Sequence, residues 1–303
     1  MATYDVIVIG EGIAGLTCAA QAARAGLRVA TFEATLFGGL VINITDLEGY
    51  PEDRQTSGAE LASEMMEANS GLGVASVQEA VEAVSKAGNG FELRTAGGRH
   101  QARQVVAASG ARMKKLGVPG EAEFEGRGVS QCADCDGPMF QNEEVVVVGG
   151  GDAALQEALV LAKFCGKVHL VHRGERFRAR PHFVEQVSAS PKISIMWNTV
   201  VDAILGGKMV EKIKIRDPRG GKTQDMACAG VFACVGLEPN SEYLPPEARR
   251  DERGFLVTGD TLETSVPGIW AIGAVRSGYS GLLKDAAAEA QRAAGGASAR
   301  LKG

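Results

Sequence analysis

The chain has 303 residues, of which 45% are hydrophobic and 23% are charged, and its formal net charge is −5. This length allows two domains, and an acidic chain without a basic cluster is a poor partner for nucleic acid or an anionic membrane. No apolar run approaches the roughly 18 residues that a membrane helix needs. The N-terminal residues do not have a signal-peptide pattern, so we expect a cytoplasmic protein that acts away from membranes.

Residues 4–34 predict a strand, a glycine turn, an alanine-rich helix and a second strand. Gly10, Gly12 and Gly15 have the spacing G-x-G-x-x-G directly after the first strand. The first glycine permits the tight turn, the second lets the backbone approach a pyrophosphate, and the third lets helix and strand pack closely. Glu33 ends the second strand, where a carboxylate can accept hydrogen bonds from an adenosine ribose. We therefore predict a bound dinucleotide; the alternative is a scaffold of the same fold without a nucleotide.

Cys132 and Cys135 have C-x-x-C spacing in the stretch SQCADCDGPMF. Two thiols so close can form a redox-active disulfide, contribute half of a metal site, or lie in an inert loop. Zinc is disfavoured because the chain has no second C-x-x-C, and no histidine has ligand spacing with the pair. The four histidines are His100, His169, His172 and His182. The cysteines that we expect to be buried as small hydrophobic residues are Cys18, Cys165, Cys228 and Cys234.

Residues 144–173 repeat the plan of the first glycine loop. Gly149, Gly151 and Ala154 form G-x-G-x-x-A, in which alanine replaces the third glycine. No acidic residue ends the second strand, and arginines follow it instead, at positions 173, 176 and 178. Guanidinium groups suit a 2′-phosphate, so this loop favours NADP over NAD. The alternatives are a vacant or repurposed site and a solvated arginine loop.

The remaining elements suggest that one domain is inserted into another. We expect further strands over residues 103–111, 226–240 and 268–275, and a helix over residues 282–300. Glycine and proline mark linkers near residues 111–121 and 237–248. The sequence therefore predicts an α/β protein with two Rossmann-like domains. The outer domain comprises residues 1–115 and 244–303, and the inner domain, with the C-x-x-C pair, comprises residues 116–243.

The motifs together resemble the low-molecular-weight thioredoxin reductases, which are flavin pyridine-nucleotide disulfide oxidoreductases. The resemblance runs nearly end to end. Besides the first glycine loop, it is carried by GG at 38–39, ASGA at 108–111, CADCDGP at 132–138, GGGDAALQEA at 149–158, HRGERFRA at 172–179, VGLEPN at 235–240 and TSVPGIWAIG at 264–273.

This resemblance implies FAD in the outer domain and NADPH in the inner one. Cys135 would face the flavin, Cys132 would attack an external disulfide, and Asp136 would protonate the leaving thiolate. The implied FAD positions are Gly10, Gly12, Ala14, Gly15, Glu33, Gly38, Gly39, Val81, Ala108, Gly110, Gly273, Ala274 and Leu282. The implied NADPH positions are Gly149, Gly151, Asp152, Ala153, Ala154, His172, Arg173, Arg178 and Gly236.

Several positions depart from the pattern of the resembled family. Polar residues that contact the flavin are replaced by Leu40, Ile44, Gly49, Ala274, Gly281 and Leu282. We expect that FAD still binds, because the pyrophosphate and ribose positions are intact, but in an altered environment and with a shifted redox potential. Gly174 replaces the second arginine of a His-Arg-Arg motif, which leaves one cationic side chain fewer to bind the phosphate. Asp134, between the cysteines, adds a carboxylate that disfavours thiolate by like charge.

The leading functional hypothesis is therefore transfer of electrons from NADPH, through FAD and the Cys132/Cys135 dithiol, to a thioredoxin-like protein disulfide. A second hypothesis keeps the flavoenzyme but changes its electron partner. It is then an oxidase of a small-molecule dithiol that uses oxygen, or a ferredoxin-dependent reductase. A third hypothesis is a non-catalytic sensor of redox state or nucleotide. Family resemblance also implies a homodimer, and we predict no metal ion.

Overall fold

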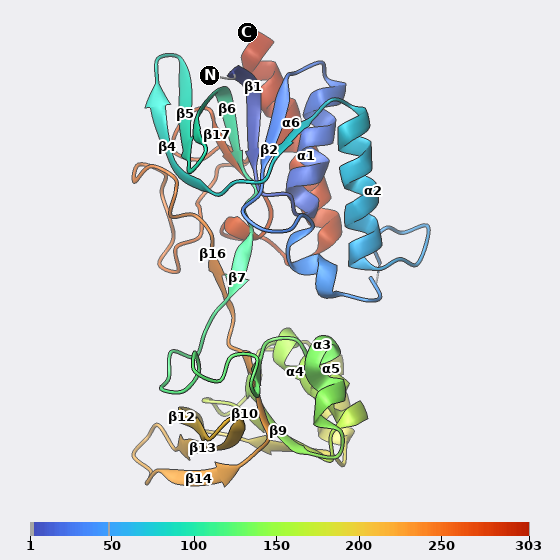
Figure 1. Ribbon diagram of the computed structural model, residues 1–303, viewed down its shortest axis with the longest axis vertical. Coiled ribbons are helices and arrows are strands. Elements are labelled where there is room, and N and C mark those ends of the chain that lie inside the picture. Colours follow the sequence, from blue (N-terminus) through green and yellow to red (C-terminus); the bar gives the residue numbers. More distant parts are fainter. Residues whose placement is uncertain (1–2, 48, 303) are drawn as a thin grey trace. The chain divides into compact units, whose positions relative to one another are not determined.

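The computed structural model describes residues 3–47 and 49–302 and divides the chain into two compact units. The outer unit comprises Met1–Arg112 and Glu238–Gly303, and the inner unit comprises Met113–Leu237. None of the helices in the described ranges is both long and apolar enough to cross a membrane. Each unit is an α/β fold in which a mainly parallel sheet carries a glycine loop after one of its central strands (Figure 1).

The outer unit is built on a seven-stranded sheet with the order β3-β2-β1-β6-β5-β4, in which β17 also pairs with β6. Strands β1, β2, β3, β6 and β17 are parallel, whereas β4, β5 and β6 form an antiparallel meander. Its elements are β1 Thr3–Ile9, α1 Ile13–Arg24, β2 Val29–Phe32, η1 Gly39–Asn43, α2 Gly58–Gly71, β3 Ala75–Val77, β4 Val81–Ala87, β5 Gly90–Thr95, β6 Gly98–Ala107, β17 Ile269–Ala271, η3 Gly273–Val275 and α6 Leu283–Lys302.

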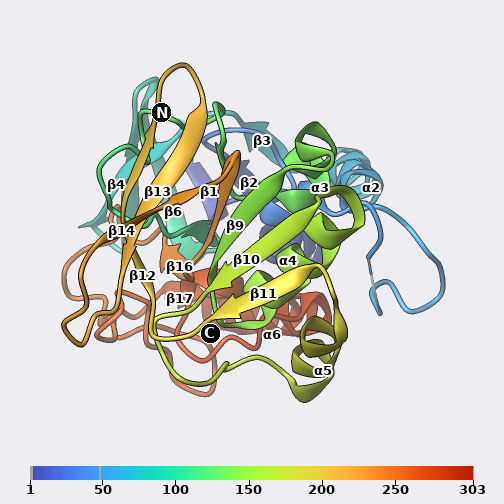
Figure 2. The same ribbon diagram turned by 90° about the horizontal axis from the view of Figure 1, so that it is seen from below.

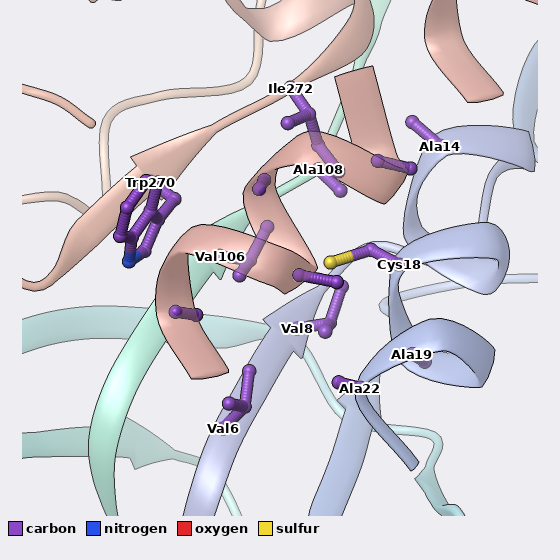
Figure 3. Close-up of a cluster of buried hydrophobic side chains, with 14 of the residues drawn as sticks. Val6, Val8, Ala14, Cys18, Ala19, Ala22, Val106, Ala108, Trp270 and Ile272 are labelled. Carbon is purple, nitrogen blue, oxygen red and sulfur yellow. The ribbon is translucent and has the colours of Figure 1, made fainter. Parts of the chain in front are cut away.

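Side chains alternate along the central strands, so each strand supplies two separate hydrophobic clusters. In β1, Val6 and Val8 pack against the alanine-rich faces of α1 and α6, together with Cys18 (Figure 3). Ile7 and Ile9 point the other way and pack with residues of the β4–β5 hairpin and of the segment around Leu256. The sheet is therefore buried on both faces, which fixes the loop after β1 in a rigid position.

The inner unit repeats this plan with a five-stranded parallel sheet of order β11-β10-β9-β15-β8. Val145 and Val147 of β9 pack towards α4 and α5, and Val146 and Val148 pack towards a three-stranded antiparallel sheet, β12-β13-β14 (Figure 2). Its elements are β8 Val129–Ser130, α3 Ala133–Asp136, η2 Gly137–Phe140, β9 Glu144–Gly149, α4 Asp152–Phe164, β10 Lys167–Val171, α5 Pro181–Ala189, β11 Ile193–Met196, β12 Val200–Gly206, β13 Val210–Arg216, β14 Gln224–Ala227 and β15 Gly230–Cys234.

The two predicted βαβ units are confirmed as β1-α1-β2 and β9-α4-β10, and the predicted α/β fold class is confirmed. The strand expected in residues 226–240, ending at Gly-Leu-Glu-Pro, is found as β15, but the segment as a whole is not a single strand. This segment contributes to β14, β15 and β16 Leu237–Pro239, each in a different sheet. Turns at Ala229 and Gly236, the latter with a positive φ of 114°, redirect the chain between the strands.

The chain passes between the units through two hydrogen-bonded strands. β7 Ala111–Met113 and β16 pair with each other, and Lys114 N donates to Gly236 O at 2.9 Å. Each change of unit falls at one of these strands, after Arg112 and after Leu237. The sequence analysis drew the boundaries after residues 115 and 243. Residues 238–243 lie in the outer unit, where Asn240 N donates to Gly110 O at 3.1 Å.

Candidate functional site

The C-x-x-C pair is a disulfide in the inner unit. Cys132 and Cys135 are joined with their Cα atoms 5.3 Å apart, and the single turn of α3 begins directly after Cys132. Cys132 is held through its backbone and its side chain: Ser130 Oγ accepts from Cys132 N at 3.1 Å, and Cys132 Sγ accepts from Cys135 N at 3.2 Å. Cys135 is exposed and Cys132 half-buried. The pair is therefore an accessible disulfide that an external thiolate can attack.

Three carboxyl groups lie on or contact the segment that carries this disulfide. Asp134 is exposed, and Asp136 is half-buried with no hydrogen bond to its carboxylate among the described residues. The third, Glu157 of α4, accepts a hydrogen bond from the backbone N–H of Ala133. Burial raises the pKa of Glu157 to about 7 despite this hydrogen bond, and the charge of Asp134 acts in the same direction as burial. Sequence reasoning missed Glu157, because the contact arises only where α3 packs on α4.

The four remaining cysteines are free and buried, which confirms that part of the sequence analysis. Burial raises the pKa of Cys18, Cys228 and Cys234 to about 12 and that of Cys165 to about 11. Because the thiolate is the reactive form of cysteine, these thiols are inert at neutral pH. The thiol chemistry of the described chain is thus confined to the C-x-x-C pair.

The first glycine loop is tightly packed at two of its glycines and open at the third. Gly10 has φ +105°, and a Cβ there would lie 2.4 Å from Ala108 O. A Cβ on Gly15 would lie 1.9 Å from Gly10 O, which lets α1 cross close over the turn. At Gly12 the nearest atom to such a Cβ is Gly38 O at 3.8 Å, and α1 has no side-chain cap. Free helix N–H groups beside open space fit a pyrophosphate.

Glu33 lies at the end of β2 beside this loop. Its Oε2 accepts from Glu11 N at 2.9 Å, and its Oε1 accepts from Thr35 N at 3.1 Å. Gly38 N donates to Glu11 O at 2.7 Å and brings the Gly38–Gly39 turn to the same place. Both carboxylate oxygens are thus oriented by backbone N–H groups, and each retains lone pairs for a ribose hydroxyl.

The other positions implied for FAD lie on several elements of the outer unit. Ala14 is buried on α1, Val81 begins β4, and Ala108 and Gly110 follow β6. Gly273 and Ala274 form η3 after β17, and a Cβ on Gly273 would lie 3.0 Å from Ala14 Cβ. The loop end of β17 is therefore held against the start of α1. Leu282 directly precedes α6 and is exposed.

A buried ion pair supports the β17 end of this unit. Glu289 of α6 accepts from Gly273 N at 2.8 Å and from the guanidinium of Arg276 at 2.5 Å. Both side chains are largely buried, and Arg276 Nε has no hydrogen-bond partner among the described residues. Sequence reasoning missed Glu289, which lies inside an alanine-rich helix and has no motif around it.

Three of the departures are exposed apolar side chains. Leu40, Ile44 and Leu282 have exposed fractions of 45%, 43% and 45%. These fractions exclude them as members of the hydrophobic core, so packing does not explain them. Gly49 has φ +70° and Gly281 has φ +86°, which a residue with a side chain adopts only with strain.

In the second glycine loop, too, one glycine is tightly packed and another faces open space. A Cβ on Gly149 would lie 2.4 Å from Cys234 O, whereas nothing lies within 4 Å of a Cβ on Gly151. Ala153 is exposed and Ala154 is buried against the sheet. Asp152 accepts from Arg180 N at 2.7 Å and from Arg180 Nε at 2.6 Å. Its carboxylate therefore binds Arg180 and holds the loop that follows β10 in place.

An open hollow of 740 Å³ lies beside this loop and is lined by residues 172–176 and Arg178. His172 fixes its floor, with Nδ1 3.0 Å from Gly149 O and Nε2 3.0 Å from Arg176 O. A Cβ on Gly174 would lie 3.1 Å from His172 Nε2, so a larger residue there would require a small shift of the His172 ring. The guanidinium groups at 173, 176 and 178 form no ion pair or hydrogen bond in residues 3–47 and 49–302, so their charges are available to a phosphate. Gly236, the last implied NADPH position, has a positive φ between β15 and β16.

Two glycine-loop folds and an accessible C-x-x-C disulfide in one chain define a dinucleotide-dependent disulfide oxidoreductase. The sequence profile described as Pyridine nucleotide-disulphide oxidoreductase matches residues 4–295. A thioredoxin reductase of Treponema pallidum is 41% identical over 275 residues, covering 90% of this chain and 89% of that protein. A bifunctional thioredoxin reductase/thioredoxin of Mycobacterium leprae is 40% identical over 273 residues, covering 89% of this chain and 60% of that protein.

Solved structures agree with these relatives. The thioredoxin reductase of Lactococcus lactis superposes with a TM-score of 0.90 at 34% identity and 97% coverage of both chains. A ferredoxin-flavin thioredoxin reductase of Clostridium acetobutylicum has a TM-score of 0.55 at 27% identity, covering 100% of this chain and 99% of that one. The chain therefore belongs to the pyridine nucleotide-disulphide oxidoreductases, and within them to the thioredoxin reductase family. This result confirms the resemblance found in the sequence.

Proposed function

We propose that this protein is an FAD-dependent reductase that transfers electrons from NADPH, through the Cys132–Cys135 disulfide, to a thioredoxin-like protein disulfide. The observation that carries this proposal is the accessible disulfide of Cys132 and Cys135 in a chain that also has two open glycine loops. Membership of the thioredoxin reductase family supports it.

The outer unit has the features that FAD binding requires. The open space at Gly12 and the uncapped start of α1 receive the pyrophosphate, and Glu33 binds the adenosine ribose. FAD held in this site would supply the chemistry that connects hydride transfer from a nicotinamide to reduction of a disulfide. The protein contributes the FAD-binding site, and the exposed side chains of Leu40, Ile44 and Leu282 give the flavin end of that site an apolar character.

The inner unit has the features that NADPH binding requires. Gly151 leaves room for the pyrophosphate at the start of α4, and Arg173 and Arg178 bind the 2′-phosphate in the hollow beside His172. An NAD-specific loop carries an acidic residue at the end of the second strand, where this chain has His172. The arginines therefore favour NADPH over NADH.

The two sulfurs divide the reaction between them. Reduction breaks the S–S bond and places two electrons on the pair. The Cys132 thiolate then attacks an external disulfide, forming a mixed disulfide and releasing one external thiolate, which Asp136 protonates. Attack by Cys135 on Cys132 Sγ restores the internal disulfide and releases the second external thiol. The half-buried Asp136 carboxyl group, free of other hydrogen bonds among the described residues, is available for that proton transfer and becomes a carboxylate when it gives up its proton.

We propose thioredoxin or a similar small protein as the partner. The M. leprae relative is named as a reductase and a thioredoxin in one chain, which supports a substrate of this type. The cytoplasm is the location that fits this chemistry, since free thiols and a reducible disulfide belong in a reducing compartment. The homodimer is proposed from the family resemblance alone. Size-exclusion chromatography with light scattering measures the assembly directly.

A ferredoxin-dependent reductase is a second candidate function. Gly174 leaves one cationic side chain fewer to bind the phosphate, and the similar C. acetobutylicum protein is named for ferredoxin. An anaerobic absorbance titration separates the candidates. Bleaching of the bound flavin by NADPH supports the leading proposal. A flavin that stays oxidised with NADPH but is reduced by dithiothreitol supports a ferredoxin-dependent reductase or a small-molecule dithiol oxidase. Purified protein that shows no turnover and neither contains nor takes up FAD would support the third hypothesis, a non-catalytic sensor of redox state or nucleotide.

A further inference from the structure

Glu157 occupies an unusual place for a carboxyl group. It projects from α4 onto the peptide that follows Cys132 and accepts a hydrogen bond from Ala133 N. This nitrogen is bonded to the carbonyl carbon of Cys132, the residue that carries the attacking sulfur in the proposed reaction. Ala133 is completely buried and Glu157 is half-buried, so the contact is partly shielded from solvent. A charge in such a place acts on the neighbouring sulfur with less screening than it would in water.

No cation compensates this carboxyl group. None of the ion pairs among residues 3–47 and 49–302 involves Glu157. The titratable groups that face it are Asp134, from the turn between the cysteines, and the buried thiol of Cys234 on β15. The charge of Asp134 raises the pKa of Glu157, and Cys234 is neutral because burial raises its pKa to about 12. All of the charge at this place is therefore negative when Glu157 is ionised.

We propose that Glu157 is a positioning residue for the dithiol: it holds the peptide after Cys132 and, when ionised, it suppresses formation of the Cys132 thiolate. This inference rests on the proposed function only in the role of Cys132 as the attacking sulfur. The first action needs only a hydrogen-bond acceptor, whereas the second needs the charge. Two substitutions can therefore separate them.

The suppression has a defined pH window. Burial raises the pKa of Glu157 to about 7, so its charge is largely absent in mildly acidic solution and fully present in mildly alkaline solution. A neighbouring negative charge disfavours a thiolate. The reduced protein should therefore gain thiolate reactivity with pH less steeply than a free thiol does, because the suppressing charge appears over the same range.

The experiment measures thiol reactivity and not turnover. The full-length protein is reduced with an immobilised phosphine, and the rate of iodoacetamide addition to Cys132 is followed by mass spectrometry from about pH 5 to about pH 9, with fragment ions that distinguish Cys132 from Cys135. The phosphine takes the oxygen of water and supplies the two electrons that open the disulfide. The four buried cysteines do not compete, because their pKa values lie at about 11 to 12.

Glu157→Gln keeps an acceptor for Ala133 N and removes the charge. We expect its alkylation rate to equal that of the wild type below about pH 6 and to exceed it about three- to tenfold above about pH 8. Glu185→Gln is the matched control, because Glu185 is an exposed glutamate on α5 of the same unit. Glu157→Ala removes both the hydrogen-bond acceptor and the charge. We expect it to have a lower thermal stability and a higher alkylation rate in alkaline solution, and these two effects report the two actions together.

The outcomes are decisive in either direction. Coincident pH profiles for the wild type and Glu157→Gln would show that Glu157 is only a structural cap and would overturn the proposal. An equal shift in Glu185→Gln would overturn it too, because the effect would then come from net charge. Neither result depends on NADPH, FAD or thioredoxin, so the proposed function fails or survives separately in the anaerobic titration.

Discussion

Glu289 and Arg276 form a buried ion pair that joins α6 to the end of β17. The carboxylate also accepts from Gly273 N, so one side chain fixes both the guanidinium and the backbone of the turn that is implied in FAD binding. The exposed fractions of the two side chains are only 17% for Arg276 and 6% for Glu289. A buried pair of this kind is sensitive to loss of one partner, because the remaining charge is left without compensation.

Glu289→Ala should therefore lower the free energy of unfolding by about 3–5 kcal/mol, measured by urea denaturation of the purified protein. The matched control is Arg300→Ala, which breaks the exposed pair with Glu263 and should cost less than about 1 kcal/mol. Equal losses in the two variants would mean that the buried pair does not stabilise the β17 turn.

Gly12→Ala should separate cofactor binding from folding. A Cβ at Gly12 meets no atom closer than 3.8 Å, so the chain should fold with unchanged thermal stability in the absence of FAD. The added methyl group fills the place of a phosphate oxygen, and losing one charge-assisted hydrogen bond weakens FAD binding about 10- to 100-fold. Gly15→Ala is the contrasting variant, because its Cβ would lie 1.9 Å from Gly10 O and should impair folding itself. FAD affinity is read by quenching of flavin fluorescence, and normal binding by Gly12→Ala would contradict the assigned FAD-binding site.

Restoring polarity at the exposed leucines should tighten FAD binding. Leu40→Gln and Leu282→Gln each supply a neutral hydrogen-bonding group at positions that the family resemblance assigns to the flavin. One neutral hydrogen bond is worth about 1 kcal/mol, or roughly fivefold in Kd. Leu72→Gln, at another exposed leucine directly after α2 in the same unit, is the control and should leave the Kd unchanged. If both leucine variants bind FAD no better than the wild type, these residues do not face the flavin.

Arg178→Ala should raise the KM for NADPH about 10- to 100-fold and leave that for NADH nearly unchanged, because a charged contact to the 2′-phosphate is lost. Arg219→Ala provides the comparison. It is a nearby exposed arginine that is already paired with Asp217 and Glu175. Steady-state assays with both nucleotides measure the effect. A similar rise for both would indicate that Arg178 acts on the shape of the loop rather than on the phosphate.

The parts that sequence could predict are those in which a local pattern has one physical meaning. The glycine loops, the apolar runs of β1 and β9, and the C-x-x-C pair each define their own geometry within a few residues. The contacts of Glu157 and Glu289 could not be predicted in this way. Each glutamate lies in a helix with no motif around it, and its partner is distant in sequence, so only the packing of the helix reveals the contact.

The alanine- and glycine-rich C-terminal segment shows the same limit. Its composition predicts a helix, but its low hydrophobicity does not predict a buried one. In the structure, Ala290, Ala293 and Ala297 of α6 are completely buried against α1 and the sheet, and a Cβ on Gly296 would lie 2.5 Å from the ring of Trp270. Small residues allow two helices to approach the sheet closely, and this use depends on the partner rather than on the segment.

The raised pKa of Glu157 should also make stability depend on pH in a specific direction. The folded-state pKa of about 7 lies above the ordinary carboxyl value of 4.5, so the folded protein binds more protons than the unfolded chain between these values. By linkage, the contribution of Glu157 to stability falls as pH rises through this window and is constant outside it. Glu157→Gln lacks this dependence. The difference in unfolding free energy between Glu157→Gln and the wild type should therefore grow in favour of the variant from about pH 5 to about pH 8, by up to about 3 kcal/mol. Urea denaturation of the oxidised proteins at both pH values measures it, and a difference that stays constant with pH would mean that Glu157 titrates in the folded protein as it does in the unfolded chain.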